Sequence, residues 1–99
     1  MSPKSFSVEF STKAVKDLKS ISSKDQAIIL NKTKLLYERP FTWKNTIKKI
    51  RGMRFPCYRL RVDGKNDSYR LFYGIADKSV LIIRIVSKKK ADRIIKAMR

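Results

Sequence analysis

The first forty residues change from a two-residue to a helical spacing of apolar positions. Phe6, Val8 and Phe10 alternate with polar residues, which predicts a short, half-buried strand. Ser11 or Thr12 is then suited to cap a helix. Its apolar positions recur every three or four residues, at Ala14, Val15, Leu18 and Ile21.

A second helix is predicted to begin at Ser23 and to end near Arg39. The sequence Ser23-Lys24-Asp25-Gln26 matches the capping-box pattern at a helix start. Pro40 disfavours helical backbone at the residue before it, which ends the helix there. The apolar residues of this segment include Ile28, Ile29, Leu35 and Leu36. The two helices should form a hairpin whose apolar stripe is buried against the later part of the chain.

From Thr46 onward the apolar positions follow a period of two, which predicts strands. We expect strands at about residues 46–51, 55–63, 67–75 and 79–86, with hairpin turns at 63–67 and 77–78. A short helix should follow over 88–98, with Ala91, Ile94, Ile95 and Met98 as its apolar side. This order predicts a single α+β domain over residues 1–99, in which an N-terminal strand and a helical hairpin pack on a twisted antiparallel sheet.

Three arginines should converge on one face of this sheet. Successive strand side chains point to opposite faces, so Arg59 and Arg61 project together, away from the apolar residues between them. Arg70 lies in the next predicted strand. A guanidinium offers a planar fork of donors that matches phosphate oxygens, so this face suits a phosphate-rich ligand. The alternative is that these arginines are only the solvated side of an amphipathic strand.

The charge of the chain favours the phosphate interpretation. Its 99 residues include 25 Lys and Arg against 8 Asp and Glu, a net charge of +17. Residues 44–99 alone carry 17 basic and 4 acidic side chains, a net of +13. A domain this basic has a polyanion as its natural partner, either nucleic acid, an acidic protein or an anionic membrane surface.

A membrane is the weakest of these three candidates. The longest apolar run, Val80 to Val86, holds seven residues and is interrupted by Arg84, whereas a spanning helix needs roughly 20. Arg84 is expected to share a face with Ile82 and Val86, and either joins a basic groove or emerges at the sheet edge. The first residues lack the apolar core of a signal peptide, so a cytoplasmic location is expected.

Missing residue types narrow the possible chemistry. The sequence has no histidine, which excludes histidine-based triads and histidine metal sites. Its single cysteine, Cys57, excludes an internal disulfide and a thiolate metal cluster, and is expected to be a small buried side chain. No metal or cofactor is expected. Any catalysis must depend on arginine, lysine, tyrosine or the few carboxylates.

Four motifs carry a resemblance to a known family. They are Ala14, Lys16 and Leu18 on the first helix, then Lys49-Ile50-Arg51-Gly52, Tyr58-Arg59-Leu60-Arg61 and Tyr69-Arg70-Leu71-Phe72-Tyr73. Over about residues 6 to 95 this succession resembles the RelE/ParE toxin superfamily. The resemblance implies a toxin of a type II toxin–antitoxin pair, held inactive by an acidic antitoxin. RelE-like members enter the ribosomal A site and cut mRNA, whereas ParE-like members poison DNA gyrase.

The resemblance also implies roles for individual residues. Arg59, Arg61 and Arg70 fall where RelE-like toxins keep basic catalytic or substrate-orienting residues. Lys89 falls where an arginine stabilises the scissile phosphate, with Lys88 and Lys90 as alternatives in register. The residues expected to contact mRNA and ribosomal RNA on the ribosome are Lys48, Lys49, Arg51, Arg54, Arg84, Lys88 and Lys90. Because strand arginines are usually exposed, alanine at any of the three should leave the fold intact.

Two departures from the RelE pattern keep other functions open. The last tyrosine is Tyr73, and Ser87-Lys88-Lys89 stands where a histidine–arginine pair is frequent. RNA cleavage without histidine or metal is still possible, because the 2′-hydroxyl is an internal nucleophile and a lysine such as Lys49 or Lys89 can act as base if its pKa is lowered. A ribosome-dependent endoribonuclease is therefore the first hypothesis. A gyrase inhibitor without chemistry and a non-toxic basic nucleic-acid-binding module are the alternatives.

Overall fold

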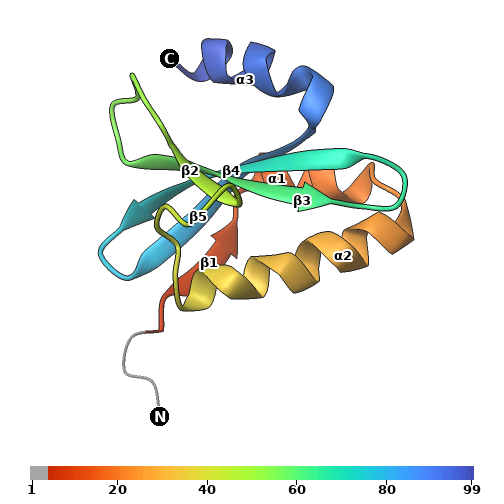
Figure 1. The fold of residues 1–99 in the computed structure, drawn as a ribbon, viewed down its shortest axis with the longest axis horizontal. Helices are drawn as coiled ribbons and strands as arrows, with labels where there is room; N and C mark the ends of the chain where they lie inside the picture. The colour runs from red at the N-terminus through yellow and green to blue at the C-terminus, as the bar shows by residue number, and fades with distance from the viewer. Residues whose placement is uncertain (1–4) are drawn as a thin grey trace.

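A five-stranded sheet in the order β1-β5-β4-β3-β2 forms the centre of the computed structural model, which describes residues 5–99 (Figure 1). The strands are β1 (Ser7–Phe10), β2 (Ile47–Ile50), β3 (Cys57–Asp63), β4 (Ser68–Ala76) and β5 (Ser79–Ser87). The helices are α1 (Thr12–Lys19), α2 (Ser23–Thr33) and α3 (Ala91–Met98), with 3₁₀ turns η1 (Lys34–Tyr37) and η2 (Lys88–Lys90). The predicted α+β class and element order are confirmed.

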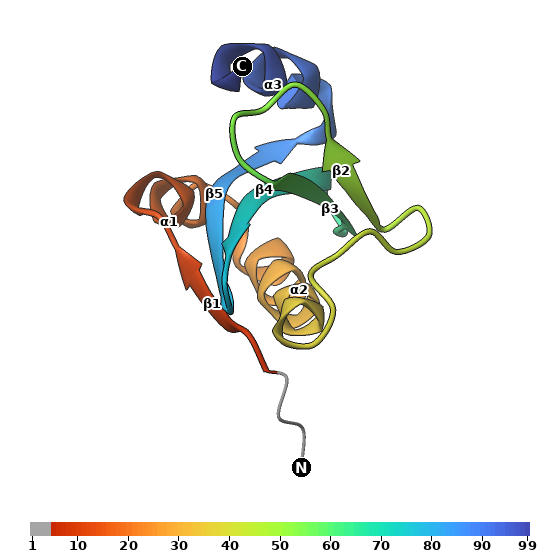
Figure 2. The same ribbon diagram turned by 90° about the vertical axis from the view of Figure 1, so that its left-hand side faces the viewer.

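The sheet separates two layers of helices, as Figure 2 shows. On one face α1 and α2 cover the main core, whose fully buried side chains include Ile29, Leu36, Leu60, Leu71 and Tyr73. On the other face α3 covers a smaller cluster made by Ile50, Cys57, Phe72 and Val86. Among residues 5–99 no helix has the length and apolar character needed to cross a membrane.

Several element boundaries differ from the predicted ones, including both ends of α2 and the start of β3. Ser22, not Ser23, caps α2, because Ser22 keeps an extended backbone and its hydroxyl accepts a hydrogen bond from the Asp25 N–H at 3.3 Å. The α-helix ends at Thr33 and continues only as the tighter turn η1. Strand β3 begins at Cys57 rather than at residue 55, since Pro56 has no N–H to donate to a strand ladder.

The sequence predicted an antiparallel sheet, but one pair of its strands is parallel. Strand β1 pairs in parallel with β5, Ser7 opposite Ser79, whereas β2 to β5 form antiparallel neighbours. Parallel strands need a long connection, and the helices and three strands between β1 and β5 supply it.

A bulge in β5 changes which residues share a face. Tyr73 is opposite Ile82, but Phe72 is opposite Arg84, so one extra residue of β5 lies between these two pairs. Ile82 therefore belongs to the main core, while Arg84 is in register with a residue of the opposite face. The expectation that Arg84 and Ile82 share a face was wrong, because the bulge breaks the two-residue period.

Candidate nucleic-acid interface

Strands β3 and β4 bring Arg59, Arg61 and Arg70 together on the face of the sheet opposite α2; we call these residues the arginine cluster. Arg61 and Arg70 are directly opposite each other in the antiparallel register, and Arg59 is two residues from Arg61 on the same face. The Arg61 side chain is 50% exposed, whereas Arg70 is only 7% exposed. The cluster thus combines a guanidinium open to solvent with one fixed beneath it.

Arg70 is held in place from within the protein. One guanidinium nitrogen, Nη1, donates to the Ser68 hydroxyl at 3.0 Å and to the Tyr69 carbonyl at 2.9 Å. Burial lowers the pKa of Arg70, and the positive charges of Arg59 and Arg61 lower it further. Arg70 is therefore not the exposed strand arginine that the sequence predicted, and its replacement by alanine would also remove buried contacts.

Asp63 is the carboxylate that faces these arginines. Its Oδ2 lies 3.3 Å from Nη2 of Arg61, and its Oδ1 accepts a hydrogen bond from the Ser68 hydroxyl at 2.7 Å. The hydrogen bond from Ser68, followed by that from Arg61, lowers the pKa of Asp63. Asp63 consequently stays ionised at neutral pH and offsets one of the three positive charges. Its role was not recognised from the sequence, where it reads as a turn residue.

A buried carboxylate, Asp25, fixes the end of the β3–β4 hairpin to α2. Its Oδ1 accepts from the N–H of Lys65 at 2.7 Å, and its Oδ2 accepts from the N–H of Asn66 at 3.1 Å and from the Tyr69 hydroxyl at 2.7 Å. The Tyr69 hydrogen bond is the main cause that lowers the pKa of Asp25, and burial raises the pKa of Tyr69 to about 12. A Cβ at Gly64 would lie 2.7 Å from Cγ of Asp25, so only glycine fits there.

This arrangement connects α2 to the arginine cluster without a break. The Tyr69 hydroxyl donates to Asp25 and the Tyr69 carbonyl accepts from Arg70. The Ser68 hydroxyl accepts from Arg70 and donates to Asp63. The turn that carries both strand ends cannot move relative to α2 without losing buried hydrogen bonds. Asp25 was interpreted from the sequence only as part of a capping box; nothing local in the sequence indicates a contact 40 residues away.

Strand β2 places its two lysines on different faces. Lys48 is opposite Arg59, so it joins the face of the arginine cluster. Lys49 is opposite Tyr58, a residue of the main core, so it points to the other side of the sheet. The lysine that lies beside the cluster is thus Lys48, whereas sequence reasoning had considered Lys49 as the base.

The basic turn η2 lies at the same end of the sheet as Arg70. Val86 is opposite Arg70 and Ser87 is opposite Tyr69, and Lys88–Lys90 follow directly. All three lysines are exposed. The fold therefore brings the predicted basic run next to the arginine cluster.

The other predicted basic residues lie apart from the cluster. Arg51 and Arg54 are exposed in the turn between β2 and β3, at the opposite end of β3 from Arg61, where the Arg51 carbonyl accepts a hydrogen bond from Arg99. Arg84 emerges at the sheet edge and pairs with Asp17 of α1, Nε to Oδ2 at 2.8 Å. Asp17 also accepts a hydrogen bond from the N–H of Ile85. Because β1 pairs with β5 only as far as Ile82, this side chain covers the part of the β5 edge that β1 leaves open.

Helix α3 limits the open part of this face. Ile94, Ile95 and Met98 pack against the small cluster around Cys57 and Phe72, next to Arg59 along the strand. Cys57 is fully buried, as predicted, and burial raises the pKa of its thiol to about 11. The thiol is therefore protonated and inert at neutral pH. Within residues 5–99 no group of three or more Cys, Asp and Glu side chains gathers to hold a metal ion.

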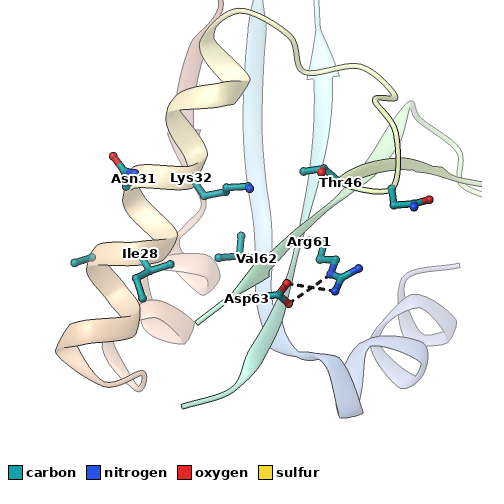
Figure 3. A pocket seen from close by; sticks show the side chains of 9 residues that line it. Ile28, Asn31, Lys32, Thr46, Arg61, Val62 and Asp63 are labelled. Atoms are coloured by element: carbon teal, nitrogen blue, oxygen red, sulfur yellow. Dashed lines mark hydrogen bonds and ion pairs between the residues drawn. The ribbon is translucent and has the colours of Figure 1, made fainter. Parts of the chain in front are cut away.

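A cavity of about 500 Å³ opens beside Arg61, between α2, the loop before β2 and the edge of β3 (Figure 3). We call it the α2–β3 pocket. Its lining residues are Ala27, Ile28, Asn31, Lys32, Asn45, Thr46, Arg61, Val62 and Asp63. These residues come from three separate segments of the chain, so the pocket was not predicted from the sequence.

Comparisons with known proteins match the sequence and the fold of this chain. The family described as "ParE toxin of type II toxin-antitoxin system, parDE" matches residues 8–92. A mutant of E. coli toxin RelE in the free state has a TM-score of 0.73 at 22% identity, covering 95% of this chain and 93% of that chain. The intact E. coli RelBE toxin–antitoxin complex has a TM-score of 0.68 at 26% identity, covering 83% of this chain and 95% of that chain.

A more distant structure shares the same fold. The chromosomal ParDE system of P. aeruginosa has a TM-score of 0.60 at 15% identity, covering 85% of this chain and 97% of that chain. A search of curated protein sequences found no match.

Proposed function

This chain belongs to the ParE toxin family of type II toxin–antitoxin systems, within the RelE/ParE superfamily, and we propose that it is an endoribonuclease that cuts mRNA in the ribosomal A site. The arginine cluster is the observation that carries this proposal. Arg70 is fixed below the surface, and Arg61 reaches solvent beside it. Holding several guanidinium groups together costs electrostatic repulsion, which a bound phosphate would relieve.

The cluster can supply the largest part of the chemistry. In the proposed reaction the 2′-oxygen of the RNA attacks the adjacent phosphorus, the bond to the 5′-oxygen breaks, and a 2′,3′-cyclic phosphate forms. The arginines stabilise negative charge on the non-bridging oxygens in the transition state. One group takes the proton of the 2′-hydroxyl and one returns a proton to the leaving 5′-oxygen.

Two lysines are our candidates for the proton transfers. Lys48 is the cross-strand neighbour of Arg59, and Lys89 follows the end of β5 that pairs with the strand of Arg70. Separate alanine variants at Lys48 and Lys89 should therefore each lower the cleavage rate more than they lower the affinity for RNA.

A gyrase inhibitor is the second candidate function. It is favoured by the match to the ParE family and by the absence of tyrosine after Tyr73, where RelE-like nucleases commonly have one. In this case the basic face would bind a protein rather than catalyse a reaction.

One experiment separates the two functions. The protein is induced in cells, the 5′ ends of mRNA are mapped, and the supercoiling of a reporter plasmid is measured in the same culture. Cuts in phase with codons, lost in the Arg59→Ala, Arg61→Ala double variant, support the endoribonuclease. Altered supercoiling with intact mRNA, or full toxicity of the double variant, contradicts it.

A cognate acidic antitoxin is the proposed inhibitory partner. It can cover Arg59 and Arg61, or displace α3 and so move Lys88–Lys90. The second route is open because α3 has only eight residues and no side-chain cap at its start. Hydrogen exchange distinguishes them: faster exchange in residues 88–98 on binding indicates displacement, whereas protection there and in 57–62 indicates covering. No change in either region would contradict both routes.

A further inference from the structure

We propose that the α2–β3 pocket binds one nucleobase of an RNA strand whose phosphate is held by the arginine cluster. The proposal rests on the proposed function and adds a site for base selection to it. Arg61 is the connecting residue, because it belongs both to the arginine cluster and to the pocket wall. In this proposal the phosphate of a nucleotide contacts Arg61 and its base enters the pocket at the edge of β3.

The composition of the walls fits a nucleobase. Ala27 and Ile28 provide apolar surface for the flat faces of a base, above the buried Val62. Asn31, Asn45 and Thr46 provide uncharged donors and acceptors of the kind that pair with base edges. A volume of about 500 Å³ lies in the range of small-ligand sites.

The polar groups of the pocket are available to a ligand. Among the nine side chains drawn in Figure 3, dashed lines join only Arg61 to Asp63. The amides of Asn31 and Asn45 and the hydroxyl of Thr46 thus make no hydrogen bonds to one another or to the remaining lining residues. The pocket is also fixed relative to the arginine cluster, because the Arg61 N–H donates to the Thr46 carbonyl at 2.8 Å.

Asp63 gives the pocket a preference among bases. The ionised carboxylate accepts hydrogen bonds only, and its two oxygens have more acceptor positions than Arg61 and Ser68 use. Adenine, cytosine and guanine carry an exocyclic amino group with two N–H donors for its oxygens, whereas uracil offers only its single N3–H.

The test is a two-dimensional NMR titration of the full chain with inorganic phosphate and with the four nucleoside 3′-monophosphates. We expect phosphate to shift the arginine side-chain signals of the cluster only. The nucleotides should also shift the amides of residues 27–32, 45–46 and 62. The three amino-bearing nucleotides should bind about tenfold more tightly than the uridine nucleotide, the low end of what one good base contact provides.

Variants of exposed residues give matched controls. Asn31→Ala and Asn45→Ala should reduce nucleotide affinity to that of phosphate, leaving phosphate binding unchanged. Asp63→Asn should abolish the preference against uridine. Thr42→Ala alters an exposed residue of the same loop as Asn45 but outside the pocket lining, so it should change neither the nucleotide affinity nor the preference against uridine. Amide spectra that match the wild type away from the pocket establish that each variant is folded.

Two contrary results have different meanings. If nucleotides shift only the signals that phosphate shifts, the pocket proposal is wrong and the proposed function stands. If neither phosphate nor any nucleotide shifts the arginine signals, the proposed function is wrong and the pocket proposal fails with it.

Discussion

Replacing Arg61 by alanine removes the most exposed guanidinium of the arginine cluster and tests whether the cluster contacts phosphate. Half of this side chain is open to solvent, and the side chain of its ion-pair partner Asp63 is exposed as well. Exposed pairs contribute less than about 1 kcal/mol to stability, so Arg61→Ala should fold normally. Its effect should therefore appear in binding to RNA.

The size of the effect follows from the number of phosphate contacts. Each contact to single-stranded RNA contributes about −0.7 to the slope of log affinity against log salt concentration. Three contacts, one for each arginine of the cluster, give a slope of about −2.1, a roughly 18-fold loss of affinity between about 50 and 200 mM salt. Without Arg61 the slope becomes about −1.4, and the loss over the same interval falls to roughly sevenfold.

The measurement is fluorescence anisotropy of a labelled RNA oligonucleotide, repeated at several salt concentrations between about 50 and 200 mM so that the slope is defined. The matched control is Lys13→Ala on α1. It also removes one positive charge, but from the helix layer formed by α1 and α2, away from the arginine cluster, and it should keep the wild-type slope. Urea unfolding of both variants establishes that their folds are equally stable. Equal slopes for Arg61→Ala and Lys13→Ala would refute the reasoning, since the cluster would then make no phosphate contact through Arg61.

Three further predictions concern other contacts of the site and core. Asp63→Asn removes the carboxylate that offsets one charge of the arginine cluster, so it should tighten the binding of inorganic phosphate while costing less than about 1 kcal/mol in urea unfolding; an unchanged phosphate affinity would mean that Asp63 does not weaken the cluster. Because the pKa of Asp25 is lowered from 3.8, its stabilisation exists above that pH and is lost as the pH falls through the folded value. Asp25→Asn should thus destabilise at pH 7 and lose this effect in acid, whereas a pH-independent difference in unfolding midpoint would contradict the assignment. Tyr73→Phe removes a buried hydrogen bond to the Pro40 carbonyl, 2.8 Å long, and should cost about 1–3 kcal/mol in chemical unfolding; an unchanged midpoint would mean the bond contributes nothing.

Most of the fold could be predicted because local patterns determined it. The alternation in residues 57–62 and 67–75 predicted that the three arginines converge on one face, and the observed register does so by setting Arg61 opposite Arg70. The same logic assigned both helices of the hairpin and α3. Local signals were least exact at element ends, where a neighbouring serine served equally well as the cap of α2.

The parts that were missed depend on contacts between distant segments. The bulge in β5 and the parallel pairing of β1 leave no mark on the two-residue period. The carboxylate of Asp25 reads as part of a cap, although it receives hydrogen bonds from a turn 40 residues away. The burial of Arg70 and the α2–β3 pocket arise in the same way, because each is formed by side chains from several elements.

The parallel pairing of β1 with β5 has a consequence for how the protein is made. Among the described strands β1 leaves the ribosome first and its neighbour β5 leaves last, with 72 residues separating Ser7 from Ser79. At typical synthesis rates that interval lasts roughly 4–14 s. Long-range pairing also forms slowly compared with local contacts. Each nascent chain therefore passes several seconds with β1 unpaired, and Arg70 is covered on its β5 side roughly 1–3 s after its own synthesis, as translation of this domain finishes.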